Sequence, residues 1–120
     1  MNGLKIAVPT TGNKLLNDRV ADTFSRASTF TFVSVQNGKI MEVDFIKNDV
    51  KELKQGAGPL VAGIMKENSV ELVFSGDIGP GASSILNTIG IEIVHISSGL
   101  KVRNVINNWL KENASVPFII

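Results

Sequence analysis

The sequence contains no cysteine and a single histidine. The absence of cysteine excludes disulfides, cysteine zinc sites, thiol nucleophiles and cysteine-ligated iron–sulfur clusters within the chain. The one histidine, His95, has no second imidazole with which to complete a conventional metal site. Because it falls inside a predicted strand, we expect His95 to be a packed or hydrogen-bonded core residue in preference to a ligand.

The chain also lacks a strong charge and a long apolar run. Its 12 basic and 11 acidic side chains leave a net charge of +1, which argues against nonspecific binding to nucleic acid or acidic membranes. No apolar run approaches the ~20 residues of a membrane span. The opening residues lack the apolar segment of a signal peptide. We therefore expect a cytoplasmic protein that binds neither nucleic acid nor membrane.

What is present suits one globular domain. The 120 residues are 43% hydrophobic and 19% charged, which is ordinary for a chain that buries its own core. No repeat, linker or low-complexity stretch divides the sequence. We expect a single domain over residues 1–120.

Apolar residues recur with two periods along the chain. The period-two or continuous runs predict strands over residues 4–8, 29–35, 40–46, 70–74 and 91–96, with Pro9 closing the first. Asn37-Gly38 between the second and third runs is typical of a tight hairpin. Helical spacing marks residues 60–65, 82–89 and 102–110. Trp109 lies on the last apolar stripe, which favours a core role over a ligand platform. The apolar stretch 116–120 would pack on the domain or on a partner.

The order of these elements predicts an α/β fold. Helices alternate with strands in the second half, which indicates parallel strands joined by right-handed crossovers. The hairpin makes one strand antiparallel to the rest. We therefore predict a three-layer α/β/α arrangement around a five-stranded mixed sheet of order 3-2-1-4-5, with strand 2 antiparallel.

Chain direction then brings four loops to one edge of the predicted sheet. They follow strands one, three, four and five and cover residues 9–13, 54–59, 75–81 and 97–99. This edge carries the carboxyl ends of the parallel strands, where open α/β sheets bind ligands. The sequence therefore predicts a binding cleft between these loops.

Two of the loops have glycines where a helix begins. Gly56 and Gly58 in QGAGP, and Gly79 and Gly81 in SGDIGPGA, let a ligand approach the main chain closely. The unpaired N–H groups and the dipole of a helix N-terminus favour an anion. Neither loop is a Walker loop or a dinucleotide fingerprint. Taken alone, each is also explained as a tight turn from strand to helix.

Polar side chains complete the predicted cleft. Arg26 suits a carboxylate or phosphate, or alternatively an ion pair with Asp18 or Asp22. We interpret Asp77 as an N-terminal cap of the helix that follows it, which is a structural role. The residues expected to contact a ligand are Thr10, Thr11, Arg26, Gly56, Gly58, Gly76, Gly79 and Gly81.

Catalysis has little support in the sequence. There is no Ser-His-Asp spacing and no close pair of carboxylates in the predicted cleft, so we expect a protein that is not an enzyme.

Four segments together resemble one family. KIAVPT at the start, Phe24-Ser25-Arg26-Ala27, QGAGPLVAGIM and VFSGDIGPGA are similar to segments of the dinitrogenase iron–molybdenum cofactor biosynthesis family. The resemblance covers nearly the whole chain. It implies a ribonuclease-H-like fold and a role as a carrier or accessory protein of a metal-cluster cofactor, of the iron–sulfur or iron–molybdenum type. It also implies a protein partner in cofactor assembly.

The chain departs from the metal-binding members of that family at two places. Thr23 stands where these relatives usually carry a histidine, and Ser25 replaces a glycine. The stretch before the first glycine-rich loop, KELKQ, has no histidine either. The usual cluster ligands are therefore missing, although the scaffold is kept.

Three hypotheses follow. The first is a small non-catalytic binding protein that holds an anionic ligand or metallocofactor on backbone N–H groups of residues 56–58 and 79–82, with Arg26, Thr10 and Thr11 nearby. The alternative is an interaction or structural protein whose ligand site has decayed, with residues 116–120 or a strand edge as its contact surface. The third, a hydrolase or nuclease, rests on fold analogy alone.

Overall fold

The computed structural model describes residues 3–53 and 55–114. Along the chain it contains five strands, three α-helices and one short 3₁₀ helix. They are β1 (Gly3–Thr10), η1 (Leu15–Asn17), β2 (Thr29–Gln36), β3 (Lys39–Lys47), α1 (Ala57–Glu67), β4 (Leu72–Ser75), α2 (Pro80–Thr88), β5 (Glu92–His95) and α3 (Val102–Ala114). The apolar stretch 116–120 lies outside the described residues.

The sheet has the order that the sequence predicts. Its strands run β3-β2-β1-β4-β5, with β2 antiparallel to both neighbours and β4 parallel to β1 and β5. The hairpin between β2 and β3 turns at Asn37 and Gly38, whose φ angles of 53° and 78° are both positive, as a type I′ turn requires. The predicted fold is confirmed in its layers, order and strand directions.

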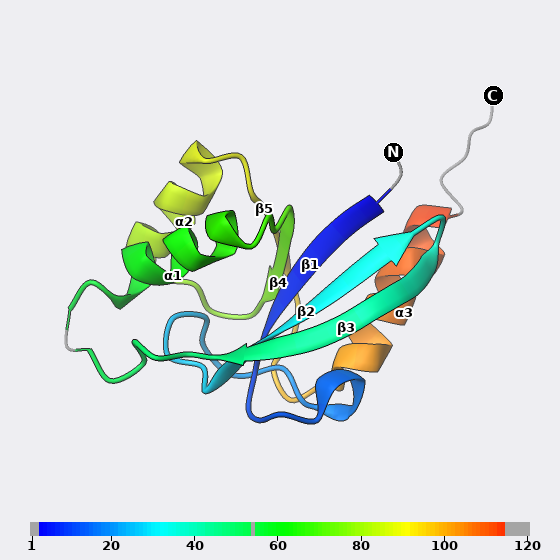
Figure 1. Ribbon diagram of the computed structural model, residues 1–120, viewed down its shortest axis with the longest axis horizontal. Helices are drawn as coiled ribbons and strands as arrows, with labels where there is room; N and C mark the ends of the chain where they lie inside the picture. The colour runs from blue at the N-terminus through cyan, green and yellow to red at the C-terminus, as the bar shows by residue number, and fades with distance from the viewer. Residues whose placement is uncertain (1–2, 54, 115–120) are drawn as a thin grey trace.

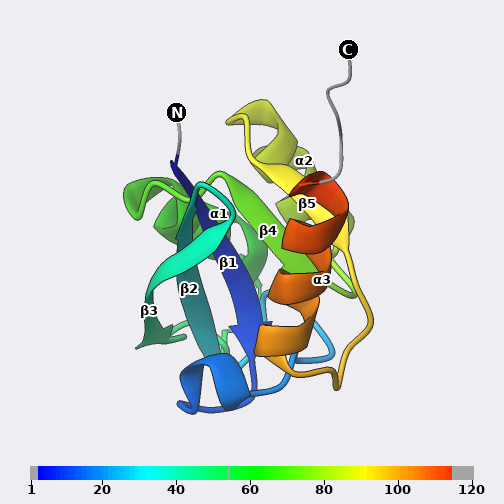
Figure 2. The same ribbon diagram turned by 90° about the vertical axis from the view of Figure 1, so that its right-hand side faces the viewer.

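Helices cover both faces of this sheet, as Figures 1 and 2 show. On one face α1 and α2 bury Phe24, Phe30 and Met65. On the other, α3 packs over Ile6 and Phe74, and the ring of Trp109 meets Phe74 edge-on with centroids 5.6 Å apart. Trp109 therefore contributes to packing, as its place on the apolar stripe predicts. No helix among the described residues is long and apolar enough to cross a membrane.

Strand β1 continues beyond the predicted end at Val8. Pro9 pairs with Phe30 and Thr10 with Thr29, so both belong to the ladder with β2. Proline is tolerated here because its carbonyl faces Ala21, whose N–H it accepts at 2.8 Å, and its missing N–H lies on that same side, away from β2. The prediction that Pro9 ends the strand is wrong.

Candidate functional site

A pocket of about 320 Å³ opens between the loop that follows β1 and the starts of α1 and α2. Asp77 and Gly79 place it at the predicted edge of the sheet, where β4 ends and the chain enters α2. The lining residues are Thr23, Phe24, Ser25, Arg26, Gln55, Gly56, Ala57, Gly58, Asp77 and Gly79.

The N-terminus of α1 forms one wall of this pocket. Gly56, the cap residue, has φ of +80°, a left-handed conformation that glycine adopts without strain. The first hydrogen bond of the helix runs from the N–H of Leu60 to the carbonyl of Gly56. The N–H groups of Ala57 and Gly58 precede it and have no acceptor within the helix. This wall therefore offers backbone donors and the positive end of a helix dipole.

The N-terminus of α2 meets that of α1 at very close range. A Cβ on Gly58 would lie 3.2 Å from the Cβ of Ala82 and 3.4 Å from its backbone nitrogen. A Cβ at position 58 would therefore force Ala82 to shift by a few tenths of an ångström, so glycine suits this approach. Gly79 caps α2 in an extended conformation and Pro80 occupies its first turn, where a missing N–H costs nothing. Two helix N-termini thus face the same corner of the molecule.

Phe24 positions the loop that forms the opposite wall. Its side chain is fully buried and packs on Phe30 with ring centroids 5.6 Å apart. Its backbone N–H donates to the carbonyl of Asp77 at 3.1 Å, and Thr23 and Asp77 form a parallel bridge. This isolated bridge joins the loop after β1 to the loop after β4, so backbone hydrogen bonding holds the pocket wall in place.

Arg26 stands at the rim with its guanidinium engaged by main chain. Its Nη1 donates to the carbonyl oxygens of Lys51, at 2.8 Å, and Leu53. Beside it, the side-chain amide of Asn48 donates to the carbonyls of Ser25 at 2.8 Å and Ala27 at 2.9 Å. These bonds tie the loop before α1 to the loop after β1. Arg26 therefore both brings positive charge to the pocket and supports its rim.

Asp77 lines the same pocket but does not cap α2. The cap residue is Gly79, and no side-chain hydrogen bond closes that helix end. The capping prediction is wrong because the bridge to Thr23 fixes the backbone of Asp77 two residues before the cap. Its side chain is exposed. It also lines a neighbouring pocket of about 440 Å³, together with Asp22, Gly76, Ile96, Ser97 and Ser98.

The predicted ligand residues therefore separate into groups. Arg26, Gly56, Gly58 and Gly79 line one pocket, and Gly76 lines the neighbouring one. Gly81 lies in the first turn of α2 with open space where a Cβ would be. The sequence did not lead us to expect Thr23, Phe24, Ser25 or Gln55 as contact residues. Their place beside Arg26 and Gly56 in the sequence was the signal available for them.

Both threonines lie away from this pocket. Thr10 is fully buried, and its hydroxyl is within 2.6 Å of that of Thr29 and 2.9 Å of that of Thr31. The hydroxyl of Thr11 donates to Asp18 at 2.8 Å, within a separate pocket of about 240 Å³. Because β1 continues through Pro9 and Thr10, the first of the four predicted loops contributes no residue to this pocket.

Asp18 organises the turn after β1. Its carboxylate accepts the backbone N–H groups of Lys14 at 2.8 Å and Arg19 at 2.7 Å, together with the N–H and hydroxyl of Thr11. Burial alone would raise the pKa of Asp18, but these hydrogen bonds to the ionised form outweigh it and hold the pKa below its usual value. The carboxylate is a structural acceptor.

His95 is exposed at the end of the edge strand β5. The expectation of a core histidine is wrong, because β5 is the edge strand of the sheet among the described residues and His95 is its last residue. Within residues 3–53 and 55–114, no three acidic, histidine or cysteine side chains come close enough to hold a metal ion. Direct metal ligation therefore has no donor set in the described part of the chain.

Known proteins share this sequence and fold. The chain is 29% identical over 90 residues to an uncharacterised protein of Methanocaldococcus jannaschii, covering 75% of this chain and 72% of that protein. The apo form of the orange protein from Desulfovibrio gigas superposes with a TM-score of 0.80 at 28% identity, over 96% of this chain and 92% of the other. A Thermotoga protein provisionally assigned as NifB gives a TM-score of 0.74 at 25% identity, over 90% and 88% of the chains.

A family model agrees with these likenesses. The model described as dinitrogenase iron-molybdenum cofactor matches residues 4–112, which include every element from β1 to the greater part of α3. The resemblance that four sequence segments indicate is confirmed, and this chain belongs to the dinitrogenase iron–molybdenum cofactor family.

Proposed function

We propose that this protein is a non-catalytic carrier that binds an anionic metallocofactor, or a small anion related to it, in the pocket between Arg26, Gly56 and Gly79. The observation that carries the proposal is the pairing of a cationic rim with the N-terminus of α1 in one pocket of about 320 Å³. That volume lies in the range typical of small-molecule sites. Family membership supplies the class of cargo.

The donor set of the pocket decides how such a cargo would be held. Thiolate and imidazole ligands do not fit, because the chain has no cysteine and its one histidine lies on β5 outside the pocket. Backbone N–H groups and a guanidinium do fit the negatively charged periphery of a cluster or an oxyanion. We therefore place the ligand's oxygen or sulfur atoms, and not its metal, against Ala57, Gly58 and Arg26.

The chemistry of the pocket agrees with transport in preference to reaction. Among the described residues that line it, the ionisable side chains are Arg26 and Asp77, which carry opposite charges. Neither has a neighbouring base or acid in the pocket with which it could form a proton relay. A carrier needs differential binding and release, which hydrogen bonds to backbone donors provide.

The test is a titration with molybdate, and separately with inorganic phosphate, followed by ¹H–¹⁵N amide shifts. We expect the amides of Ala57, Gly58, Gly81 and Ala82 to shift at saturable concentrations, and the hairpin amides of residues 37 and 38 to stay unchanged. Arg26→Gln should weaken binding by about 10- to 150-fold, because an interaction between an anion and a charged donor contributes about 1.5–3 kcal/mol.

Lys111→Gln, which removes a positive charge from α3, is the matched control and should leave the affinity unchanged. Shifts confined to residues away from the two helix N-termini would refute the carrier proposal. They would favour the alternative, an interaction protein with a decayed ligand site. One observation supports that alternative: the guanidinium of Arg26 already bonds to the carbonyls of Lys51 and Leu53.

A further inference from the structure

Basic residues gather around the start of α3. Lys101 immediately precedes this helix, and Arg103 lies in its first turn. Lys14 and Arg19 lie on either side of η1, which contacts α3, and they line the same pocket of about 240 Å³. Figures 1 and 2 both show the short helix η1 beside the beginning of α3. All four residues are exposed, and we call them the basic corner.

Backbone and side-chain contacts hold the basic corner together. Arg19 and Lys101 form an isolated antiparallel bridge. The guanidinium of Arg19 donates to the carbonyl of Gly99 at 2.9 Å, and that of Arg103 donates to the side-chain oxygen of Asn17 at 3.4 Å. Both acceptors are neutral, so these bonds orient the two guanidinium groups without cancelling their charge.

Little negative charge accompanies these basic residues. Asp18 is the only acidic residue in the segments 1–21 and 96–111 of the sequence, and its carboxylate already accepts the hydrogen bonds of the turn after β1. Strand β3 also contacts η1, but Asp44 of β3 pairs with Phe32, which belongs to the core under α1 and α2. Because paired residues share a face, Asp44 lies on the side of the sheet opposite α3.

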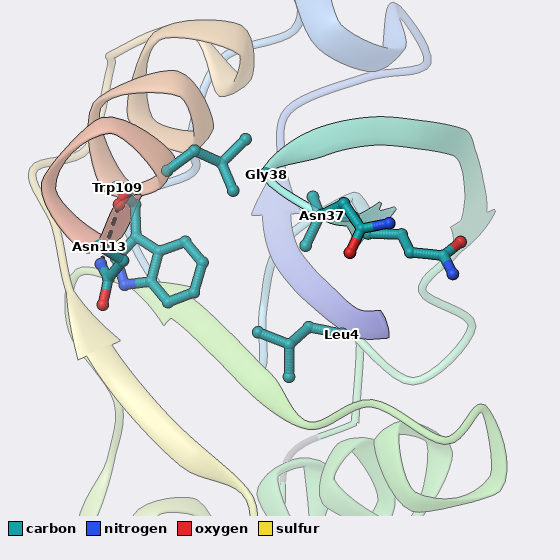
Figure 3. A pocket seen from close by; sticks show the side chains of 8 residues that line it. Leu4, Asn37, Gly38, Trp109 and Asn113 are labelled. Atoms are coloured by element: carbon teal, nitrogen blue, oxygen red, sulfur yellow. Dashed lines mark hydrogen bonds between the residues drawn. The ribbon is translucent and has the colours of Figure 1, made fainter. Parts of the chain in front are cut away.

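The charge of α3 is distributed unevenly between its two ends. Towards its last turns, Trp109 and Asn113 border a pocket of about 340 Å³ beside the β2–β3 hairpin, and none of the described residues that line this pocket is charged (Figure 3). At its start the helix has no acidic residue in the first turn. Basic side chains at this end add to the positive end of the helix dipole. The basic corner is therefore a localised positive surface.

We propose that the basic corner is a docking surface for a carboxylate-rich segment of a partner protein. Guanidinium groups bind carboxylates through two parallel hydrogen bonds, and Arg19 and Arg103 supply two such groups. Lys14 and Lys101 add positive charge, which speeds the encounter with an acidic partner.

A protein segment fits the basic corner better than a nucleic acid does. The net charge of the chain is only +1, and residues 10–21 and 96–104 contain no aromatic side chain on which a base could stack. Asp22 and Asp77 line the next pocket along this edge and would repel a phosphate backbone that extended beyond the corner.

The basic corner lies on the same edge of the sheet as the pocket near Arg26. Ser97 and Ser98 follow β5 and line the pocket of about 440 Å³, which shares Asp77 with the pocket near Arg26. A partner at the corner would therefore be held close to that pocket. The docking inference stands apart from the carrier proposal, because none of the residues of the basic corner lines the pocket near Arg26.

The test is a titration of the full-length protein with hexaglutamate at low salt, followed by ¹H–¹⁵N amide shifts, with hexaglutamine as the neutral comparison. We expect hexaglutamate alone to shift the amides of the basic corner saturably, and the affinity to fall as salt is added. Lys14→Gln combined with Lys101→Gln should weaken binding about tenfold, because each exposed ion pair contributes up to about fivefold.

Lys39→Gln combined with Lys66→Gln is the matched control. It removes the same charge from exposed positions on β3 and α1, and it should change the affinity less than about twofold. The proposal is wrong if the Lys14 and Lys101 variant binds as the control does, or if hexaglutamate shifts only amides outside the basic corner.

Three further results would assign the surface to a different occupant and overturn the proposal. Saturation of the same amides by inorganic phosphate alone would make it a small-anion site. Tighter binding of hexathymidylate than of hexaglutamate would make it a nucleic-acid site. Shifts of these amides that depend on protein concentration without any peptide would make the occupant a second copy of the chain.

Discussion

Ser75 is the last residue of β4 and is fully buried, yet its hydroxyl has no hydrogen-bond partner among the described residues. An unpaired buried hydroxyl loses its water without compensation. Ser75→Ala should therefore raise the free energy of unfolding by about 1 kcal/mol, measured by urea denaturation. If Ser75→Ala instead lowered the free energy of unfolding by a similar amount, this expectation would be contradicted. The hydroxyl would then have a partner such as an ordered water.

Single residues also show where local sequence misleads. Asp77 precedes a helix and has the side chain of a good cap, but its backbone is held by the bridge to Thr23, so Gly79 takes the cap position. His95 belongs to an apolar run, but it ends an edge strand and faces outward. For Asp77 the deciding contact comes from a loop distant in the sequence, and for His95 the place of β5 at the edge of the sheet decides.

The N-termini of α1 and α2 pack closely against each other through Gly58 and Ala82. Gly58→Val would push a side chain into Ala82, and such overpacking costs about 1–3 kcal/mol. We expect Gly58→Val to lower stability by that amount, measured by chemical denaturation, and to weaken anion binding, measured by amide-shift titration.

Gly63→Ala in the same helix is the matched control. No atom lies within 4 Å of the position that its Cβ would take, and Gly63 is exposed. Alanine should therefore stabilise α1 by about 0.5–1 kcal/mol through its higher helix propensity. If Gly58→Val behaved like Gly63→Ala, close contact between the helix N-termini would be ruled out.

The whole molecule should lose stability in acid partly through Asp18. Its folded pKa lies below the usual value of 3.8, so its contribution is fully present above that value and is lost as pH falls through the folded pKa. At pH 7, Asp18→Asn should lower the free energy of unfolding by about 1–3 kcal/mol, because an amide cannot accept all four hydrogen bonds. The difference between variant and wild type should shrink by pH 3.

Urea denaturation at both pH values checks this. Asp44→Asn is the control, because Asp44 is exposed on β3 and should leave the pH dependence unchanged. If Asp18→Asn lowered the free energy of unfolding equally at pH 7 and pH 3, the carboxylate would contribute through its shape and not through its charge.

At this scale the sequence predicts most of the architecture. The strand order, the antiparallel β2 and the helices on both faces follow from apolar periodicity and from Asn37-Gly38, because these are local signals that the fold agrees with. The ribonuclease-H-like designation and the ligand roles of Thr10, Thr11 and the loop glycines stay predictions. Thr10 shows why contact residues are harder to predict. Because β1 extends two residues beyond its predicted end, the hydroxyl of Thr10 bonds to that of Thr29 on β2.

The sequence by itself determined which chemistry is available. Without cysteine, and with one histidine, the chain offers neither a thiolate nor a pair of imidazoles as metal ligands. The periodicity of apolar residues also determined the layers. Only the tertiary structure decided which loops meet, because strand length, the bridge from Thr23 to Asp77 and the contact of Gly58 with Ala82 join residues far apart in the chain. Those long-range contacts turn two ordinary glycine-rich turns into two walls of one pocket.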